Sequence, residues 1–413
     1  MTSSDLHDQM REMGRAARRA ANALAVAPAE QRSAAIRAMA MRLREAEGAI
    51  LAANAADMED ATAHHDRLLL DAGRIESIAA SLEQIAELPD PVGVEMDRWV
   101  RPNGLDIARV RTPIGVIGMI YEARPNVTAD AAAICLRSGN AVILRSGSEA
   151  QRSAIAIHAA LVRGLDDAAF DPNAVQIVAT TDREAVGMLL SGLDGTIDLI
   201  IPRGGKALVE RVSREGRVPV LGHLEGICHS YVHAAADPAM AVDIVRNAKL
   251  RRVSICGATE TLLIDREVAS ELLPKIVQAL DGCELRGDAG ARTIVPMKVA
   301  AAEDWDTEYL APILAVRLVD GIDEAIDHIA RHGTGHTDAI ITQDENAAEK
   351  FMSRVDSAIA IWNASTQFAD GGEFGFGAEI GIATGKLHAR GPVGPEQLTS
   401  FKYKMRGSGQ TRP

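Results

Sequence analysis

Hydrophobic residues in the first 85 positions recur at helical spacing, and most of them are alanine. Two amphipathic segments stand out, Gln9–Ala25 and Ala29–Ala56. Pro28 lies between them, and proline ends or interrupts a helix because it lacks the backbone N–H. The N-terminal region is therefore predicted to be helical, with a break at Pro28.

A polar stretch follows in which Asn103-Gly104 lies between two strand-like runs. Asn-Gly is typical of a tight β-hairpin turn, because both residues tolerate positive φ. We expect this hairpin, at about residues 95–112, to form an arm that reaches a neighbouring subunit. The segment Gln397–Lys404 alternates apolar and polar side chains, so it could pair with the hairpin as a further strand.

From Ile114 onward, short apolar strands alternate with amphipathic helices, a pattern that predicts parallel sheets covered by helices on both faces. A first set extends to about residue 221 and a second begins near Met240. The predicted strands are Ile114–Ile120, Ala141–Leu144, Val175–Val178, Ile197–Ile201, Val218–Leu221, Thr261–Ile264, Ile313–Val319, Ala339–Thr342 and Ala358–Ile361. The fold class is α/β, with domains expected at 1–235 (nucleotide binding), 236–385 (catalytic) and 386–413 (C-terminal strand and tail).

The balance of charged residues limits the classes of molecule that the chain is expected to bind. With 44 basic and 57 acidic residues the formal charge is −13, which argues against nucleic acid and anionic membranes. The chain has no run of about 20 apolar residues and no signal-peptide pattern. The four cysteines are scattered without C-x-x-C pairs, so a reducing, cytoplasmic setting is expected.

Three strand ends carry small or basic residues suited to a phosphate group. They are Arg145-Ser146-Gly147-Ser148, Ala179-Thr180-Thr181 and Pro202-Arg203-Gly204-Gly205-Lys206. Ligands of parallel sheets bind beyond the carboxyl ends of the strands, and a helix that begins after Gly205 would direct N–H groups at a phosphate. No G-x-G-x-x-G follows a strand, so turn glycines and solvated arginines remain an equal alternative.

Cys256 lies in the loop RRVSICGAT between a helix and a strand. Arg251 and Arg252, if they face the sulfur, would favour the thiolate, which is the nucleophilic form. A buried structural cysteine is the alternative that the residues alone leave open. The histidines show no metal-ligand spacing and no G-x-S-x-G is present, so neither metal catalysis nor serine hydrolysis is indicated.

Longer motifs resemble one particular family. YEARPNVTAD, DLIIPRGGKAL, the Cys256 loop and ADGGEFGFGAEIGI are similar to segments of the γ-glutamyl phosphate reductases, also called glutamate-5-semialdehyde dehydrogenases, within the aldehyde dehydrogenase superfamily. The similarity runs over nearly the whole chain and is weakest in the first 90 residues. It implies a Rossmann-type nucleotide-binding domain, an α/β catalytic domain and a small β oligomerisation element in a homodimer or homotetramer.

The resemblance also implies the reaction. L-glutamate 5-phosphate would be reduced with NADPH to L-glutamate 5-semialdehyde and phosphate, the second step of proline synthesis from glutamate, without a metal. Cys256 would be the nucleophile, and the Asn126 side chain with the Cys256 N–H would stabilise the oxyanion. The acyl phosphate is labile, so handover from glutamate 5-kinase is a further expectation.

Other residues take roles by the same resemblance. Glu308 would hold the nicotinamide ribose. Arg145 and Ser148 would favour NADP(H) over NAD, because a basic residue attracts the 2′-phosphate and a serine replaces a repelling glutamate. Arg124 is a candidate anion contact, with a structural ion pair as the alternative. Glu225 lies near the position of the deacylating base of oxidising relatives, and a structural or substrate-facing role is expected for it instead.

Two other functions stay open. An oxidising aldehyde dehydrogenase would release a free acid with water and would not need phosphate. A non-catalytic scaffold would bind a nucleotide or glutamate 5-kinase, although the presence of Cys256, Asn126 and Glu308 speaks against it.

Overall fold

The computed structural model describes residues 3–61, 65–376 and 379–412. Gly377 and Ala378, inside the glycine-rich motif, lie outside this range. The chain divides into two compact units, one formed by 1–222, 375–381 and 393–413, and the other by 223–374 and 382–392. Among the described helices, none has the length and apolar character needed to cross a lipid bilayer.

The first unit is built on a parallel four-stranded sheet in the order β5-β4-β3-β6. Alanine-rich helices pack tightly on it; for example, a Cβ on Gly164 of α7 would lie 2.5 Å from the Met39 nitrogen of α2. The strands are β3 (Val116–Tyr121), β4 (Ala141–Ser146), β5 (Val175–Ile177) and β6 (Leu199–Arg203). The helices are α1 (Ser3–Leu24), α2 (Ala29–Glu45), α3 (Glu47–Asp60), α4 (His65–Leu68), α5 (Ala72–Glu87), α6 (Val127–Arg137), α7 (Gln151–Asp167), α8 (Arg183–Leu190) and α9 (Lys206–Glu215).

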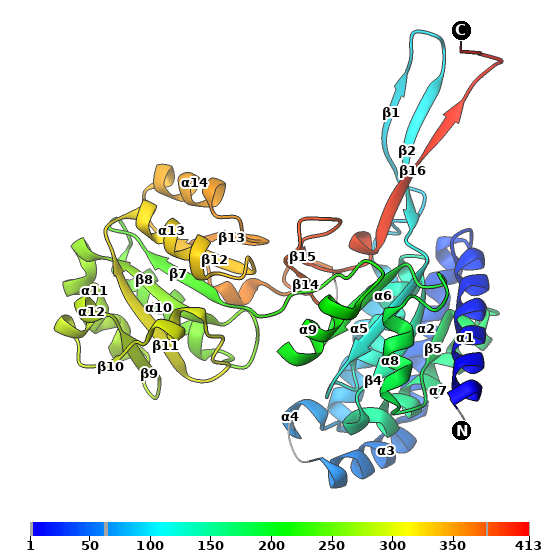
Figure 1. Ribbon diagram of the computed structural model, residues 1–413, viewed down its shortest axis with the longest axis horizontal. Coiled ribbons are helices and arrows are strands. Elements are labelled where there is room, and N and C mark those ends of the chain that lie inside the picture. The colour runs from blue at the N-terminus through cyan, green and yellow to red at the C-terminus, as the bar shows by residue number, and fades with distance from the viewer. Residues whose placement is uncertain (1–2, 62–64, 377–378, 413) are drawn as a thin grey trace. The chain divides into compact units, whose positions relative to one another are not determined.

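The predicted arm is present in the first unit. Strands β1 (Glu95–Val100) and β2 (Asp106–Pro113) form an antiparallel hairpin in which Gly104 has φ +84°, and β16 (Thr399–Arg406) pairs along β2. Figure 1 shows these strands extending away from the helices of their unit. Val100, Tyr403 and Met405 are all more than half exposed. The oligomerisation role of this arm stays a prediction.

The second unit contains a parallel seven-stranded sheet in the order β10-β9-β11-β8-β7-β12-β13. Its strands are β7 (Cys228–Val232), β8 (Thr259–Asp265), β9 (Glu284–Gly287), β10 (Lys298–Val299), β11 (Ile313–Val319), β12 (Thr337–Ile341) and β13 (Ile359–Trp362). Later in the chain, the short strands β14 (Ile382–Ala383) and β15 (Gly391–Pro392) pair with each other. Its helices are α10 (Pro238–Leu250), α11 (Arg266–Ala279), α12 (Ala289–Ile294), α13 (Ile322–His332) and α14 (Glu345–Arg354).

Both faces of this sheet are buried because side chains alternate across it. Leu262 and Ile264 of β8 pack into one core with α10 and α11, whereas Leu263 between them packs into the opposite core with α13 and α14. Figure 1 shows the two groups of helices on either side of the sheet. The predicted α/β class with parallel, doubly covered sheets is confirmed.

The structure shifts the domain boundary from the one that the sequence indicated. Residues 223–235 were expected in the first domain, but β7 lies there and pairs with β8 and β12 of the second unit. The C-terminal part of the chain alternates between the units, since 375–381 and 393–413 belong to the first unit and 382–392 to the second. The predicted strand Val218–Leu221 is reduced to one bridge between Val220 and Ile200.

Candidate active site

Cys256 lies beside two histidines at the amino ends of the strands in the second unit's sheet. His223 precedes β7, Cys256 lies in the turn before β8, and His336 directly precedes β12. These three strands are adjacent and parallel, so their amino ends meet at the same edge. One ligand atom from each of the three side chains lies within 4.8 Å of the others.

The segment before β7 packs tightly against the Cys256 turn. A Cβ on Gly226 would lie 2.1 Å from the Cys256 carbonyl oxygen, so only glycine fits there without displacing the turn. The Cys228 thiol donates to that same carbonyl at 3.1 Å. Both contacts hold the backbone of the Cys256 turn in one position.

Hydrogen bonds also fix both imidazole rings. Nδ1 of His223 lies 2.6 Å from the Ile382 carbonyl, which can only accept, so this nitrogen carries the proton. Nδ1 of His336 lies 2.9 Å from the Thr337 hydroxyl. The two rings meet edge to face with centroids 4.9 Å apart. Their orientation is therefore set by the protein rather than by solvent.

The histidines decide the ionisation of the sulfur. Burial raises the pKa of Cys256, but the charge and hydrogen bonding of His336 and His223 outweigh it and hold that pKa well below its ordinary range. Burial raises the pKa of Cys135, Cys228 and Cys283, the last to about 11. Cys256 is half-buried and still reachable. Of the four cysteines, it alone has the character of a nucleophile.

The arginines expected to favour the thiolate do not perform that role. Arg251 and Arg252 are exposed, and the Arg251 guanidinium lies 3.4 Å from the Gln367 amide oxygen. The groups that lower the Cys256 pKa are His336 and His223 instead. No sequence pattern indicated the two histidines, because they lie far apart in the chain and only the strand order β8-β7-β12 brings them together.

Glu308 also lies at the amino ends of these strands. It lies ahead of β11, and its carboxylate accepts the Gly226 N–H at 3.0 Å. Burial raises the pKa of Glu308, and the nearby negative charges of Cys256 and Glu225 raise it further. Glu308 and Glu225 are thus close enough to interact electrostatically. Glu308 and Cys256 both contact Gly226.

The remaining predicted residues gather at the carboxyl ends of β3, β4 and β6 in the first unit. Arg124 and Asn126 follow β3, and the other residues end or follow β4 and β6, namely Arg145, Ser146, Gly147, Ser148, Pro202, Arg203, Gly204 and Gly205. Two buried polar atoms here, Arg145 Nε and Ser146 Oγ, have no hydrogen-bond partner among the described residues. This is the edge where parallel sheets bind nucleotides.

Two carboxylates modify the expected phosphate site. The Gly205 N–H ahead of α9 already donates to Glu122 at 3.1 Å, so it is not directed only at a ligand. Glu149, next to Ser148, accepts the Ala123 N–H at 2.7 Å. The loop that contains Ser148 therefore still carries a negative charge, that of Glu149.

Asn126 is held by a half-buried carboxylate. Its Nδ2 donates to Asp130 Oδ2 at 2.9 Å across the first turn of α6. Burial raises the pKa of Asp130 to about 6, although the Asn126 hydrogen bond opposes that shift. An ionised Asp130 can only accept, so it fixes which end of the amide is the donor and leaves the second N–H of Nδ2 for another acceptor.

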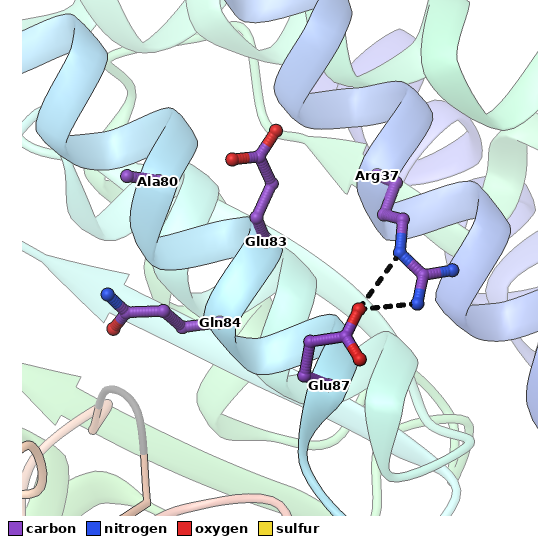
Figure 2. Close-up of a pocket in the computed structure, with 5 residues that line it drawn as sticks. All are labelled: Arg37, Ala80, Glu83, Gln84 and Glu87. Atoms are coloured by element: carbon purple, nitrogen blue, oxygen red, sulfur yellow. Dashed lines mark hydrogen bonds and ion pairs between the residues drawn. The ribbon is translucent and has the colours of Figure 1, made fainter.

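A surface pocket lies elsewhere, between α2 and α5 (Figure 2). It is lined by Arg37, Ala80, Glu83, Gln84 and Glu87, and none of these is a predicted site residue. Arg37 donates to Glu87 across it at 2.6 Å. An ion pair between two helices accounts for this polar surface.

The Cys256 pKa can be tested by alkylation. At neutral pH, iodoacetamide is expected to modify Cys256 first, with a pH midpoint well below that of an ordinary thiol. His336→Gln should move the midpoint upward, because it removes the group that lowers this pKa most. Mass spectrometry of peptides from protein alkylated over a pH series measures both effects. Equal labelling of Cys283 at neutral pH would contradict the assignment.

Known proteins resemble this chain over most of its length. The aldehyde dehydrogenase family model matches residues 3–303 and 293–382. A γ-glutamyl phosphate reductase of Caulobacter vibrioides is 67% identical, in an alignment that covers 98% of this chain and 100% of the relative. The crystal structure of the Thermotoga maritima γ-glutamyl phosphate reductase superposes with a TM-score of 0.95 at 42% identity, covering 98% of this chain and 100% of that one.

A more distant structure, an engineered glycolyl-CoA reductase with bound NADP+, covers 96% of both chains with a TM-score of 0.70 at 15% identity, a likeness of fold alone. The family match spans most of the chain, and the high-identity relatives span nearly all of it. The chain therefore belongs to the aldehyde dehydrogenase family and, within it, to the γ-glutamyl phosphate reductases.

Proposed function

We propose that this chain reduces L-glutamate 5-phosphate with NADPH to L-glutamate 5-semialdehyde and phosphate, the second step of proline biosynthesis from glutamate. The name of its relatives supports this substrate. The observation that carries the chemistry is the half-buried Cys256, whose pKa is held well below its ordinary range by two imidazoles. A thiolate at neutral pH is what attack on an acyl phosphate requires.

The reaction begins at sulfur. The Cys256 thiolate attacks the acyl carbon, the carbon–oxygen bond to phosphate breaks, and phosphate leaves with the electron pair. This produces a thioester on Cys256. His336 and His223 keep the sulfur ionised before the attack, and they stabilise the thiolate again when the aldehyde departs. A metal ion is not needed for any of these steps.

Asn126 is proposed to donate to the oxyanion that forms during the attack. Its amide orientation is set by Asp130, so a donor is ready without rearrangement. Asn126→Ala is expected to lower kcat by about 10²–10³-fold, the usual cost of losing one oxyanion donor. Steady-state kinetics measure this, and an unchanged kcat would remove Asn126 from the mechanism.

The cofactor residues are proposed from strand position and resemblance. Arg145, Ser146, Gly147 and Ser148 after β4 and Pro202, Arg203, Gly204 and Gly205 after β6 would contact the nucleotide, and Glu308 the nicotinamide ribose. Ser146 Oγ and Arg145 Nε, which have no hydrogen-bond partner in the described part of the chain, fit a polar ligand at this edge. When bound, NADPH supplies the hydride for reduction. Arg124 is proposed as a weaker anion contact.

The decisive assay runs the reaction in reverse. Glutamate 5-semialdehyde is supplied with NADP+ or NAD+, with and without inorganic phosphate, and reduced cofactor is followed by absorbance. Formation that requires phosphate and is faster with NADP+ is expected. Phosphate-independent formation of free glutamate would instead identify an oxidising dehydrogenase, and no turnover under any condition would favour a scaffold.

A further inference from the structure

The three side chains at the nucleophile form a set that matches a transition-metal site. Cys256, His223 and His336 each place a ligand atom within 4.8 Å of the other two. They come from turns that precede three adjacent strands, so the backbone positions are fixed by the sheet. A thiolate with two imidazoles is a ligand set for Zn²⁺ rather than for Mg²⁺ or Ca²⁺, which prefer oxygen.

The outer contacts of both rings match those of metal-bound histidines. Such histidines usually donate from one nitrogen to a carbonyl or other acceptor, which orients the second nitrogen toward the metal. His223 donates from Nδ1 to the Ile382 carbonyl at 2.6 Å, and Nδ1 of His336 contacts the Thr337 hydroxyl at 2.9 Å.

We propose that Cys256, His223 and His336 bind one Zn²⁺ ion, or a similar thiophilic divalent cation, and that binding reversibly blocks the enzyme. Zinc bonds of about 2.0–2.3 Å place ligand atoms roughly 3.5 Å apart, so small side-chain rotations suffice to close the site. The fourth position is left to water. The sulfur lone pair that would attack the acyl carbon is then shared with the metal, and a thiol proton, where one is present, is released to solvent.

Binding is tested with cobalt as the probe. The full-length, untagged protein is freed of metal with a chelator and titrated with Co²⁺, and the absorption spectrum is recorded. We expect one Co²⁺ per chain, with tetrahedral visible bands and a thiolate-to-cobalt charge-transfer band that Cys256→Ser removes. Zn²⁺ should displace the cobalt. Absence of the charge-transfer band in the unaltered protein would overturn the proposal.

Ligand identity is tested by matched variants. His223→Gln and His336→Gln should each weaken Zn²⁺ binding by about 100-fold, since even outer-shell partners of metal ligands are worth about 10–100-fold. His332→Gln and Cys283→Ser alter the same residue types outside the cluster and should leave the affinity unchanged. Circular dichroism checks that every variant is folded. Equal affinity in the cluster and control variants would place the metal elsewhere and refute the site.

Inhibition, unlike binding, rests on the proposed function, and the two can be separated. Zn²⁺ should abolish phosphate-dependent turnover in proportion to site occupancy, and a chelator should restore it. An enzyme that turns over normally with Zn²⁺ bound at this site would refute the block. A protein that binds Co²⁺ through Cys256 but shows no reductase activity would support the metal site and refute the proposed reaction.

Discussion

Cys256→Ser is expected to lower kcat for L-glutamate 5-phosphate reduction on the order of 10⁴-fold or more, the scale seen when a catalytic nucleophile is removed. The replacement is nearly isosteric, but a serine hydroxyl stays protonated where the Cys256 thiol, with its lowered pKa, is ionised. The loss should appear in kcat, because no contact that holds the nucleotide is removed. Stopped-flow or steady-state assays that follow NADPH oxidation measure the loss of kcat.

The matched control is Cys283→Ser, which changes a half-buried cysteine whose pKa is raised to about 11. It should retain full activity. NADPH binding to the Cys256→Ser protein, followed by fluorescence, should also be unchanged, which separates lost chemistry from lost folding. A Cys256→Ser enzyme that keeps its rate within about tenfold would exclude the thioester route.

Lys249→Met is expected to reduce the free energy of unfolding by about 3–5 kcal/mol, the cost of leaving one partner of a buried ion pair uncompensated. Lys249 and Glu260 are both fully buried and form an ion pair. The Lys249 ammonium lies 5.8 Å over the Tyr309 ring, and Glu260 accepts the Leu310 N–H at 3.3 Å. The pair thus supports the residues that follow Glu308. Urea unfolding at pH 8 measures the loss.

The pH dependence of this variant has a definite sign. Burial raises the pKa of Glu260 to about 7 even though Lys249 lowers it, so removing the lysine raises that pKa further. A carboxyl group with a raised folded pKa loses stability as pH rises above its unfolded value. The deficit of Lys249→Met should therefore shrink between pH 8 and pH 5. The double variant Lys249→Met/Glu260→Gln should recover part of it at pH 8, and failure to recover any would show that the lost packing of the lysine stem dominates.

Local pattern was enough to predict much of the architecture. The break predicted at Pro28 is present, since α1 stops at Leu24 and α2 begins at Ala29, directly after the proline. Asn103-Gly104 predicted the hairpin because its turn needs positive φ, and β16 pairs with that hairpin as expected. These features depend on residues close in sequence, so their conformational preferences are visible in the chain itself.

Strand β7 was not predicted, because its residues do not form an apolar run. Its side chains are all buried, yet His229 and Ser230 are polar, and each bonds to a partner on a neighbouring strand. His229 bonds to Asp338 at 2.8 Å, and Ser230 to Thr259 at 2.7 Å. A polar strand of this kind becomes stable only inside the sheet that supplies its hydrogen bonds, so its hydrophobicity pattern carries no signal.

By itself, the sequence determined the α/β class, the hairpin and, through its motifs, the family and the candidate nucleophile. The tertiary structure alone decided what surrounds Cys256. The neighbouring arginines are exposed, whereas His223 and His336 lie against the sulfur because β8, β7 and β12 are adjacent and parallel. Strand order depends on pairings between distant segments, and no local preference specifies which amino ends will meet.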